Sequence, residues 1–182
     1  YGASLYLSDF LRGGCDALPD SIRQTFTGLS DWLGVSKLKP SFRALTSSRQ
    51  DAGVLLAARS AVLMRFAARL LVRPCRNVML TDLTWPVYER ILRRELPTSA
   101  CTVTRVSVRQ GIIDQQFDVQ GLVEKVAREF VQNRCDGLFL PLIDNFGIRF
   151  PVQRLVERIQ SEAELRFVVA DAAQAIHHVP LD

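Results

Sequence analysis

The chain has 182 residues, of which 48% are hydrophobic and 23% are charged, and its formal net charge is +4. This composition is typical of a globular domain with a sizeable core, and the lack of an uninterrupted apolar run of membrane-spanning length argues against a transmembrane segment. The positive charge comes almost entirely from arginines that alternate with acidic residues along helical segments, so nucleic acid is not an expected partner.

The cysteines and histidines indicate neither a disulfide framework nor a zinc site. The four cysteines are dispersed, without a Cys-x-x-Cys pair, and the only histidines are adjacent to each other near the end of the chain. No basic-then-apolar signal peptide stands at the start. These features predict a reducing, cytoplasmic environment.

Helical patterns dominate the first part of the chain. We expect a helix over residues 21–33, a connecting segment over residues 37–48 that contains Pro40, and a long alanine-rich helix over residues 48–71. The apolar stripe expected on this long helix consists of Val54, Leu55, Ala58, Val62, Phe66 and Leu70.

After Pro74 the pattern alternates between strands and helices. Apolar runs predict strands at residues 77–81, 102–107, 137–141 and 166–170, and helical periodicity predicts helices over residues 119–131 and 152–159. Such alternation implies right-handed βαβ units, and hence an α/β fold with a mostly parallel sheet between layers of helices. Because no Gly-x-Gly-x-x-Gly follows any strand, a flavodoxin-like or Rossmann-like nucleotide site lacks support.

Two polar residues follow the last predicted strand directly. Asp171 ends an apolar run, and Gln174 lies three residues further on. Ligands of open α/β sheets bind beyond the carboxyl ends of the strands, so both residues fall where a ligand is expected. The alternative is a structural one, in which Asp171 is an acidic cap on a short helix.

The same segment resembles the class V aminotransferase family, which belongs to the fold-type I enzymes that use pyridoxal 5'-phosphate (PLP) and includes cysteine desulfurases and isopenicillin N epimerase-like proteins. The motif is Asp-x-Ala-Gln-Ala-x-x-His-x-Pro-Leu-Asp, over residues 171–182, and residues 78–86 and 135–141 extend the resemblance to roughly residues 40–182. It implies a three-layer PLP-binding large domain, here partial, over residues 46–182, preceded by a helical segment over residues 1–45. It also implies a homodimer.

The resemblance assigns residues to the cofactor's ring and phosphate. Asp171 would pair with the pyridine nitrogen and keep it protonated, and Gln174 would donate to the phenolic oxygen. Ser47 and Ser48 would bind the phosphate at the start of the long helix. The family's usual small-residue turn with threonine is absent there, and the alternative is that these serines only cap the helix.

Two further positions follow from the resemblance. Trp85 would stack on the ring, with Thr84 as the alternative if the match is shifted by one residue, or with Trp85 simply packing against a helix. Asp144 and Asn145 would lie near the cofactor oxygen or the substrate carboxylate, where the family commonly has asparagine. Either could instead belong to a tight turn before Gly147.

The family's Schiff-base lysine follows Val-Pro-Leu-Asp by some twenty residues, beyond residue 182. None of Lys37, Lys39 and Lys125 stands in a matching context, so we expect a large-domain fragment without its catalytic residue. The intact protein would act on an amino acid or amine by transamination, desulfuration, epimerisation or elimination. The alternative is a non-catalytic binding or dimerisation module derived from the same fold.

Overall fold

The computed structural model describes residues 33–46, 48–57, 59–96 and 101–176. The chain divides into two compact units, residues 1–54 together with residue 182, and residues 55–181. The helix expected over residues 21–33 lies outside the described residues except at its last position. Among the described residues, no helix has the length and apolar composition needed to cross a membrane.

The first unit contains helix α3 (Leu33–Leu45), so the expectation of a connecting segment over residues 37–48 was wrong. Pro40 lies inside this helix. Proline removes one backbone hydrogen bond and disfavours a helix interior, but the helix continues through it. At the end of α3, the Thr46 hydroxyl donates to the backbone oxygen of Phe42 at 2.8 Å.

The long helix expected from residue 48 also needs correction, because helix α4 (Ser60–Val72) begins twelve positions later. Residues 48–52 form a turn in which the Ala52 N–H donates to the Arg49 oxygen at 3.0 Å. The Arg43 Nε donates to the Ala52 oxygen at 2.7 Å, and Arg49 pairs with Asp51. Serine, aspartate and glycine in this stretch favour turns over helix, which explains the late start.

The expected apolar stripe is likewise not the buried face of α4. Val62 is 54% exposed, and Phe66 and Leu70 are exposed as well. The residues of α4 that enter the core are Met64, Ala68, Leu71 and Val72. Because the helix is apolar on more than one side, periodicity alone could not identify which side is buried.

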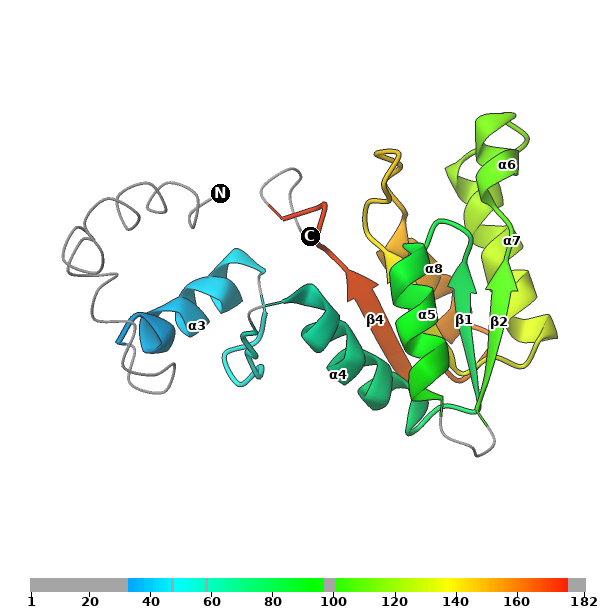
Figure 1. Ribbon diagram of the computed structural model, residues 1–182. Helices are drawn as coiled ribbons and strands as arrows, with labels where there is room; N and C mark the ends of the chain where they lie inside the picture. The colour runs from blue at the N-terminus through cyan, green and yellow to red at the C-terminus, as the bar shows by residue number, and fades with distance from the viewer. Residues whose placement is uncertain (1–32, 47, 58, 97–100, 177–182) are drawn as a thin grey trace. The chain divides into compact units, whose positions relative to one another are not determined.

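The second unit contains a sheet of four parallel strands, as predicted (Figure 1). The strands are β1 (Asn77–Thr81), β2 (Thr102–Val106), β3 (Gly137–Pro141) and β4 (Phe167–Asp171). Their order is β2-β1-β3-β4. Val78 of β1 pairs with both Val103 of β2 and Gly137 of β3, which places the two central strands β1 and β3 side by side.

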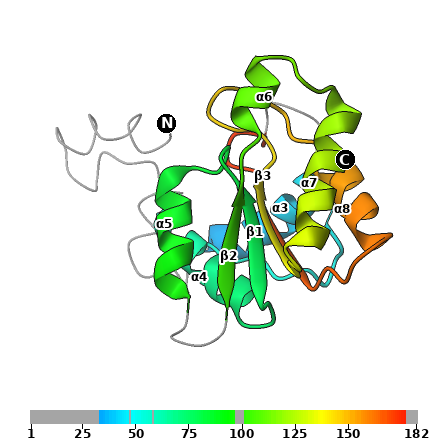
Figure 2. The ribbon, with the colours of Figure 1, turned by 90° about the vertical axis from the view of Figure 1, so that its right-hand side faces the viewer.

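Helices cover both faces of the sheet, which gives the three-layer α/β architecture (Figure 2). Helices α4 and α5 (Pro86–Glu95) lie on one face, and α7 (Val119–Gln132) and α8 (Val152–Gln160) lie on the other. The short helix α6 (Arg109–Ile113) follows β2. Helices α7 and α8 were predicted to within one residue, whereas α5 and α6 had no prediction from the sequence.

The strands alternate their side chains between two core layers. Val78, Leu80 and Phe139 pack against α4 and α5, while Met79 and Leu138 pack against α7 and α8. Helix α5 follows β1 on one face, and α8 follows β3 on the opposite face. The chain therefore diverges at the carboxyl ends of β1 and β3, which is the topological switch point where open α/β sheets bind ligands.

At the opposite, amino-terminal edge of the sheet, Asp136 ties β1 to β3. Its carboxylate accepts hydrogen bonds from the backbone N–H of Arg76, at 2.8 Å, and of Asn77, at 2.9 Å. The Arg166 Nε lies 3.6 Å from its second oxygen. The Asp136 side chain is buried, and both of its oxygens have partners.

Gly137, the first residue of β3, offers a test of the packing at this edge. A Cβ at this position would lie 2.7 Å from the Cys75 sulfur and 3.0 Å from Val78 Cγ2. Replacing Gly137 with alanine should therefore lower the unfolding free energy by about 1–3 kcal/mol, because a buried strand must shift. Urea unfolding monitored by circular dichroism measures this. Gly53→Ala, where a Cβ meets nothing within 4 Å, is the control and should leave the midpoint nearly unchanged.

Candidate active site

A cavity of about 180 Å³ lies at the switch point, at the carboxyl ends of β1, β3 and β4. Five of the seven residues predicted to contact a cofactor line it, although they come from three separate loops. The lining residues are Leu83, Trp85, Tyr88, Pro141, Ile143, Asp144, Asn145, Asp171, Ala173 and Gln174. The fold thus brings together side chains that are up to 89 positions apart in the sequence, from Trp85 to Gln174.

A second cavity, of about 240 Å³, lies between α4 and the end of β4. Ser60, the first residue of α4, lines it together with Leu63, Met64 and neighbouring apolar groups. Both cavities are bordered by Tyr88, Asp171 and Ala173, so they adjoin at the end of β4. Asp171 therefore lies between the amino terminus of α4 and the loops that carry the other polar residues.

The start of α4 is a polar feature that the sequence analysis missed. In the described part of the chain, no side chain caps this helix, and its first turn contains no acidic residue. The backbone N–H groups of a helix start and the helix dipole favour an anion there. The sequence signal was a small polar residue, Ser60, directly before an apolar helical run, but we had expected this helix to begin at residue 48.

The structure does not test the phosphate contacts predicted for Ser47 and Ser48. Ser47 lies outside the described residues. Ser48 belongs to the first unit, where its hydroxyl lies 2.6 Å from that of Thr46 and its backbone N–H donates to the Arg43 oxygen at 2.9 Å. Since α4 begins at Ser60, Ser48 does not occupy the helix start that the prediction required.

Asp171 is positioned by the last pairing of the sheet. It pairs with Pro141 of β3, and its backbone oxygen accepts from the Leu142 N–H at 2.8 Å. Its side-chain Oδ1 accepts from the Ala173 N–H at 3.0 Å, which fixes the carboxylate at the start of the turn that leads to Gln174. One oxygen thus orients the group, and the half-buried carboxylate still borders both cavities.

Asp144 lies in the loop after β3 and is only 5% exposed. Its Oδ1 accepts from the backbone N–H groups of Phe146, at 2.9 Å, and Ile148, at 2.8 Å. Gly147, at φ 81°, allows the loop to turn tightly enough for both contacts. Within the described residues, Oδ2 is buried without a hydrogen-bond partner.

Other buried polar atoms without partners also lie at this edge. In the part of the chain that the structure describes, they are Thr81 Oγ1, Thr84 Oγ1, Arg109 Nε and Asp144 Oδ2. All four follow or end β1, β2 or β3. Buried polar groups are normally hydrogen-bonded, and exceptions point to a bound ligand, water or ion. The carboxyl edge is thus where the described part of the fold leaves polar groups for a ligand.

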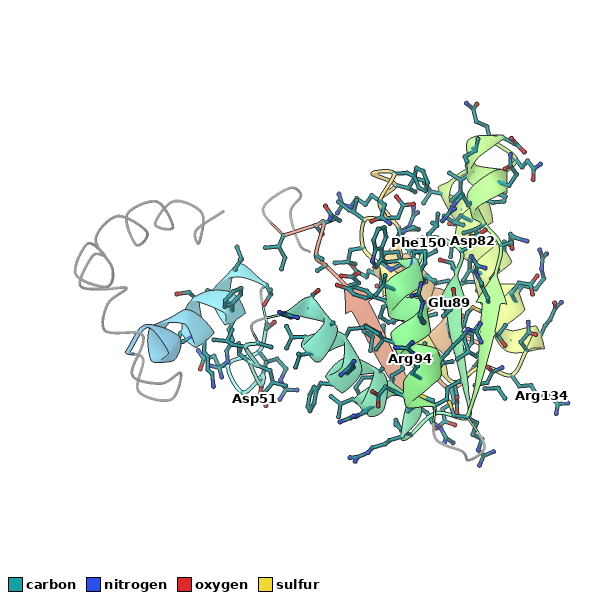
Figure 3. The ribbon with its side chains drawn as sticks, in the orientation of Figure 1. Asp51, Asp82, Glu89, Arg94, Arg134 and Phe150 are labelled. Atoms are coloured by element: carbon teal, nitrogen blue, oxygen red, sulfur yellow. The ribbon has the colours of Figure 1, made fainter. Side chains whose placement is uncertain are left out.

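The loops around the first cavity are connected by Arg109. Its guanidinium donates to the backbone oxygen of Asp82 and lies over the Phe146 ring, 5.0 Å from the centroid. The Asp82 carboxylate accepts from the backbone N–H of Val108 at 2.9 Å and of Arg109 at 3.0 Å. Figure 3 shows Asp82 at the carboxyl end of β1. These contacts hold together the loops that follow β1, β2 and β3.

Trp85 stands at the start of α5, directly before Pro86, and is 46% exposed. Its indole lines the first cavity. Thr84, the alternative for the stacking position, is buried and is not among the lining residues. Of the two candidates, Trp85 is thus the one that borders the cavity, and its stacking on a ligand stays a prediction.

Among the described residues, no cysteine and no lysine lines either cavity. Burial raises the pKa of Cys75 to about 12 and that of Cys135 to about 11, and it also raises the pKa of Cys101. Such thiols stay protonated at neutral pH and react poorly. Lys125, the only lysine after Lys39, belongs to α7 and lines neither cavity.

Comparison with known proteins supports the fold. No protein-family model matches the sequence, and no curated protein matches it either. Among solved structures, the chain is similar to a lysine-to-alanine mutant of C-DES with glycine covalently linked to its PLP cofactor, with a TM-score of 0.61 and 13% sequence identity. The match covers 98% of this chain and 44% of that one, so this chain spans less than half of its structural neighbour.

Proposed function

We propose that the intact protein is a PLP-dependent enzyme of the class V aminotransferase type that acts on an amino acid or amine. The observation that carries the proposal is the position of Asp171, at the meeting point of two cavities. One cavity leads to the start of α4, which suits an anion, and the other to Trp85 and several polar groups. A structural neighbour with covalently linked PLP has the same fold.

The phosphate of the cofactor fits the amino terminus of α4. Ser60 supplies a hydroxyl there, and the first-turn backbone N–H groups supply donors that are oriented by the helix. Leu63 and Met64 line the same cavity. In this proposal Ser60 takes the role that the sequence analysis gave to Ser47 and Ser48.

The ring fits the space on the other side of Asp171. The carboxylate of Asp171 holds a proton on the pyridine nitrogen, Trp85 covers one face of the ring, and Gln174 donates to the phenolic oxygen. Asp144, which lines the same cavity, keeps a buried Oδ2 without a hydrogen-bond partner among the described residues. When bound, PLP supplies an electron sink for charge that develops on the substrate carbon.

The reaction type and assembly belong to the same proposal. Transamination, desulfuration, epimerisation and elimination all use this electron sink, and the groups that choose among them face the substrate. The exposed apolar side chains of α4, Val62 and Phe66 among them, suit a homodimer. A cytoplasmic location agrees with the free thiols of Cys75, Cys101 and Cys135, the cysteines that the structure describes.

The test is the intact mass of the native protein before and after borohydride reduction in the presence of PLP. Reduction makes a Schiff base permanent, so we expect one added pyridoxyl group on a single lysine of the native protein. Pyridoxal without phosphate is the control and should label much less, because it lacks the group that α4 binds. No added group, or labels scattered over several lysines, would contradict the proposal.

A pair of serine variants tests the location of the phosphate. Ser60→Ala should weaken PLP binding about three- to tenfold, because one hydrogen bond to the phosphate is lost. Ser48→Ala is the matched control and should bind PLP like the unmodified protein. Both affinities can be measured by titration of cofactor absorbance. The reverse result would return the phosphate to the serines before residue 50.

A further inference from the structure

The polar residue in the loop after β3 differs from the asparagine that the family resemblance implies. Asp144 offers only acceptor oxygens in its ionised form, whereas an amide also offers two donors. A carboxylate here would repel a second carboxylate, such as that of an amino-acid substrate, if the two met directly. The chemistry of this position therefore points to a ligand group that donates hydrogen bonds.

The surroundings of Asp144 strengthen this preference. The described residues that line the first cavity include two carboxylates, Asp144 and Asp171, and no lysine, arginine or histidine. Two aromatic side chains, Trp85 and Tyr88, also line it. Negative charge and aromatic faces in one cavity both attract a cation.

Within the described part of the chain, no cationic side chain forms an ion pair with Asp144. The Oδ1 of Asp144 is occupied by two N–H groups of its own loop. The Arg109 guanidinium lies over the Phe146 ring of this loop, and Arg109 does not line the cavity. The second oxygen of Asp144 is thus a buried acceptor without a donor, and a bound group would have to supply one.

We propose that Asp144 binds a protonated amino group of the substrate, so that the substrate class is an amine with a second, cationic nitrogen. This inference rests on the proposed function, in which Asp171 is engaged by the cofactor and Asp144 remains for the substrate. A diamine and an amino acid with an ammonium side chain both carry this group. The shared chemistry is an ammonium ion at some distance from the reacting amine.

The test compares ligands that differ only in this group. The native protein is loaded with pyridoxamine 5'-phosphate, which does not condense with amines, and binding is measured by isothermal titration calorimetry. The probes are 1,5-diaminopentane against 1-aminopentane, and L-lysine against L-norleucine. We expect the diamine to bind at least about tenfold more tightly than the monoamine, because a buried carboxylate gains a charged donor.

The Asp144→Asn variant shows whether this residue is the cause. Asparagine keeps the oxygen that accepts from Phe146 and Ile148, so the loop is preserved, but the tenfold preference should disappear. Glu157→Gln removes the same charge from the exposed face of α8, where Glu157 only accepts from Gln153 at 3.0 Å, and should keep the preference. Thermal unfolding of both variants verifies that they fold.

The outcomes separate this inference from the proposed function. Equal binding of the diamine and the monoamine, or a preference that survives in Asp144→Asn, would overturn the role of Asp144 even if the cofactor binds. Failure of the cofactor to bind would count against the proposed function, and titration of the cofactor-free protein would then decide on Asp144 alone. A preference for L-lysine over L-norleucine of the same size would identify an amino acid as the source of the ammonium group, and its absence would identify a diamine.

Discussion

Replacing Asp171 with asparagine is expected to weaken PLP binding by about ten- to a hundredfold, equivalent to about 1.5–3 kcal/mol. In the proposed site its carboxylate favours the protonated pyridine nitrogen, and asparagine loses the charge that stabilises it. The amide oxygen can still accept from the Ala173 N–H, as Oδ1 does at 3.0 Å, so the turn at the end of β4 is kept. Titration of cofactor absorbance gives both affinities.

The matched control for this variant is Asp118→Asn. Asp118 caps α7, where its side chain accepts from the Gly121 N–H at 2.7 Å, and asparagine is an equally good helix cap. Asp118 lines neither cavity, so this substitution removes the same charge outside the proposed site and PLP affinity should stay unchanged. If the unmodified protein, Asp171→Asn and Asp118→Asn all bound PLP with equal affinity, Asp171 would have no role in cofactor binding. Its role would then be limited to the turn at the end of β4.

The sheet could be predicted from the sequence because its strands are short apolar runs between polar loops. β1 and β3 are buried along almost their whole length, and such strands read as continuous hydrophobic segments. Helix α5 was not predicted, since its mean composition is polar and only Ile91 and Leu92 are buried. Helix α4 was predicted, but its buried face was not, because apolar residues occur on every side of the helix.

The lining of the first cavity could be predicted only through the topology. Trp85, Asp144 and Asp171 each follow a strand, and parallel strands bring their carboxyl ends to one edge. The phosphate position could not be found in the same way, because it depends on where a helix begins. A turn at residues 49–52 precedes that start, and the helix expected from residue 48 ran across both the turn and Ser60, so Ser60 was not recognised as the first helical residue.

The two edges of the sheet differ in how their polar groups are satisfied. At the carboxyl edge, Asp144 and Thr84 keep buried atoms without partners among the described residues. At the amino edge, the buried Asp136 accepts from two backbone N–H groups and lies near Arg166. Unsatisfied polar groups lower the stability of the fold, and here they lie at the carboxyl edge, where a ligand can bind. We therefore expect the contacts at the amino edge to contribute more to the stability of the sheet.

Substitution of Asp136 by alanine should therefore lower the unfolding free energy by about 3–5 kcal/mol, a loss comparable to that of breaking a buried charged pair. The backbone N–H groups of Arg76 and Asn77 would lose their shared acceptor, and the Arg166 guanidinium would lose a carboxylate. These contacts join the starts of β1, β3 and β4, so the loss should reduce the cooperativity of the whole sheet. Urea denaturation followed by circular dichroism measures the change.

Two comparisons make this prediction specific. Asp136→Asn keeps one acceptor oxygen for the backbone N–H groups and should cost less than alanine, about 1–2 kcal/mol. Asp114→Ala removes an exposed aspartate that accepts only from Gln110 in the described residues, at 2.8 Å, and should change stability by less than about 0.5 kcal/mol. Equal urea midpoints for Asp136→Ala and Asp114→Ala would contradict this prediction. The hydrogen bonds of Asp136 would then not stabilise the amino edge, and apolar packing around Cys75 and Val78 would have to provide its stability.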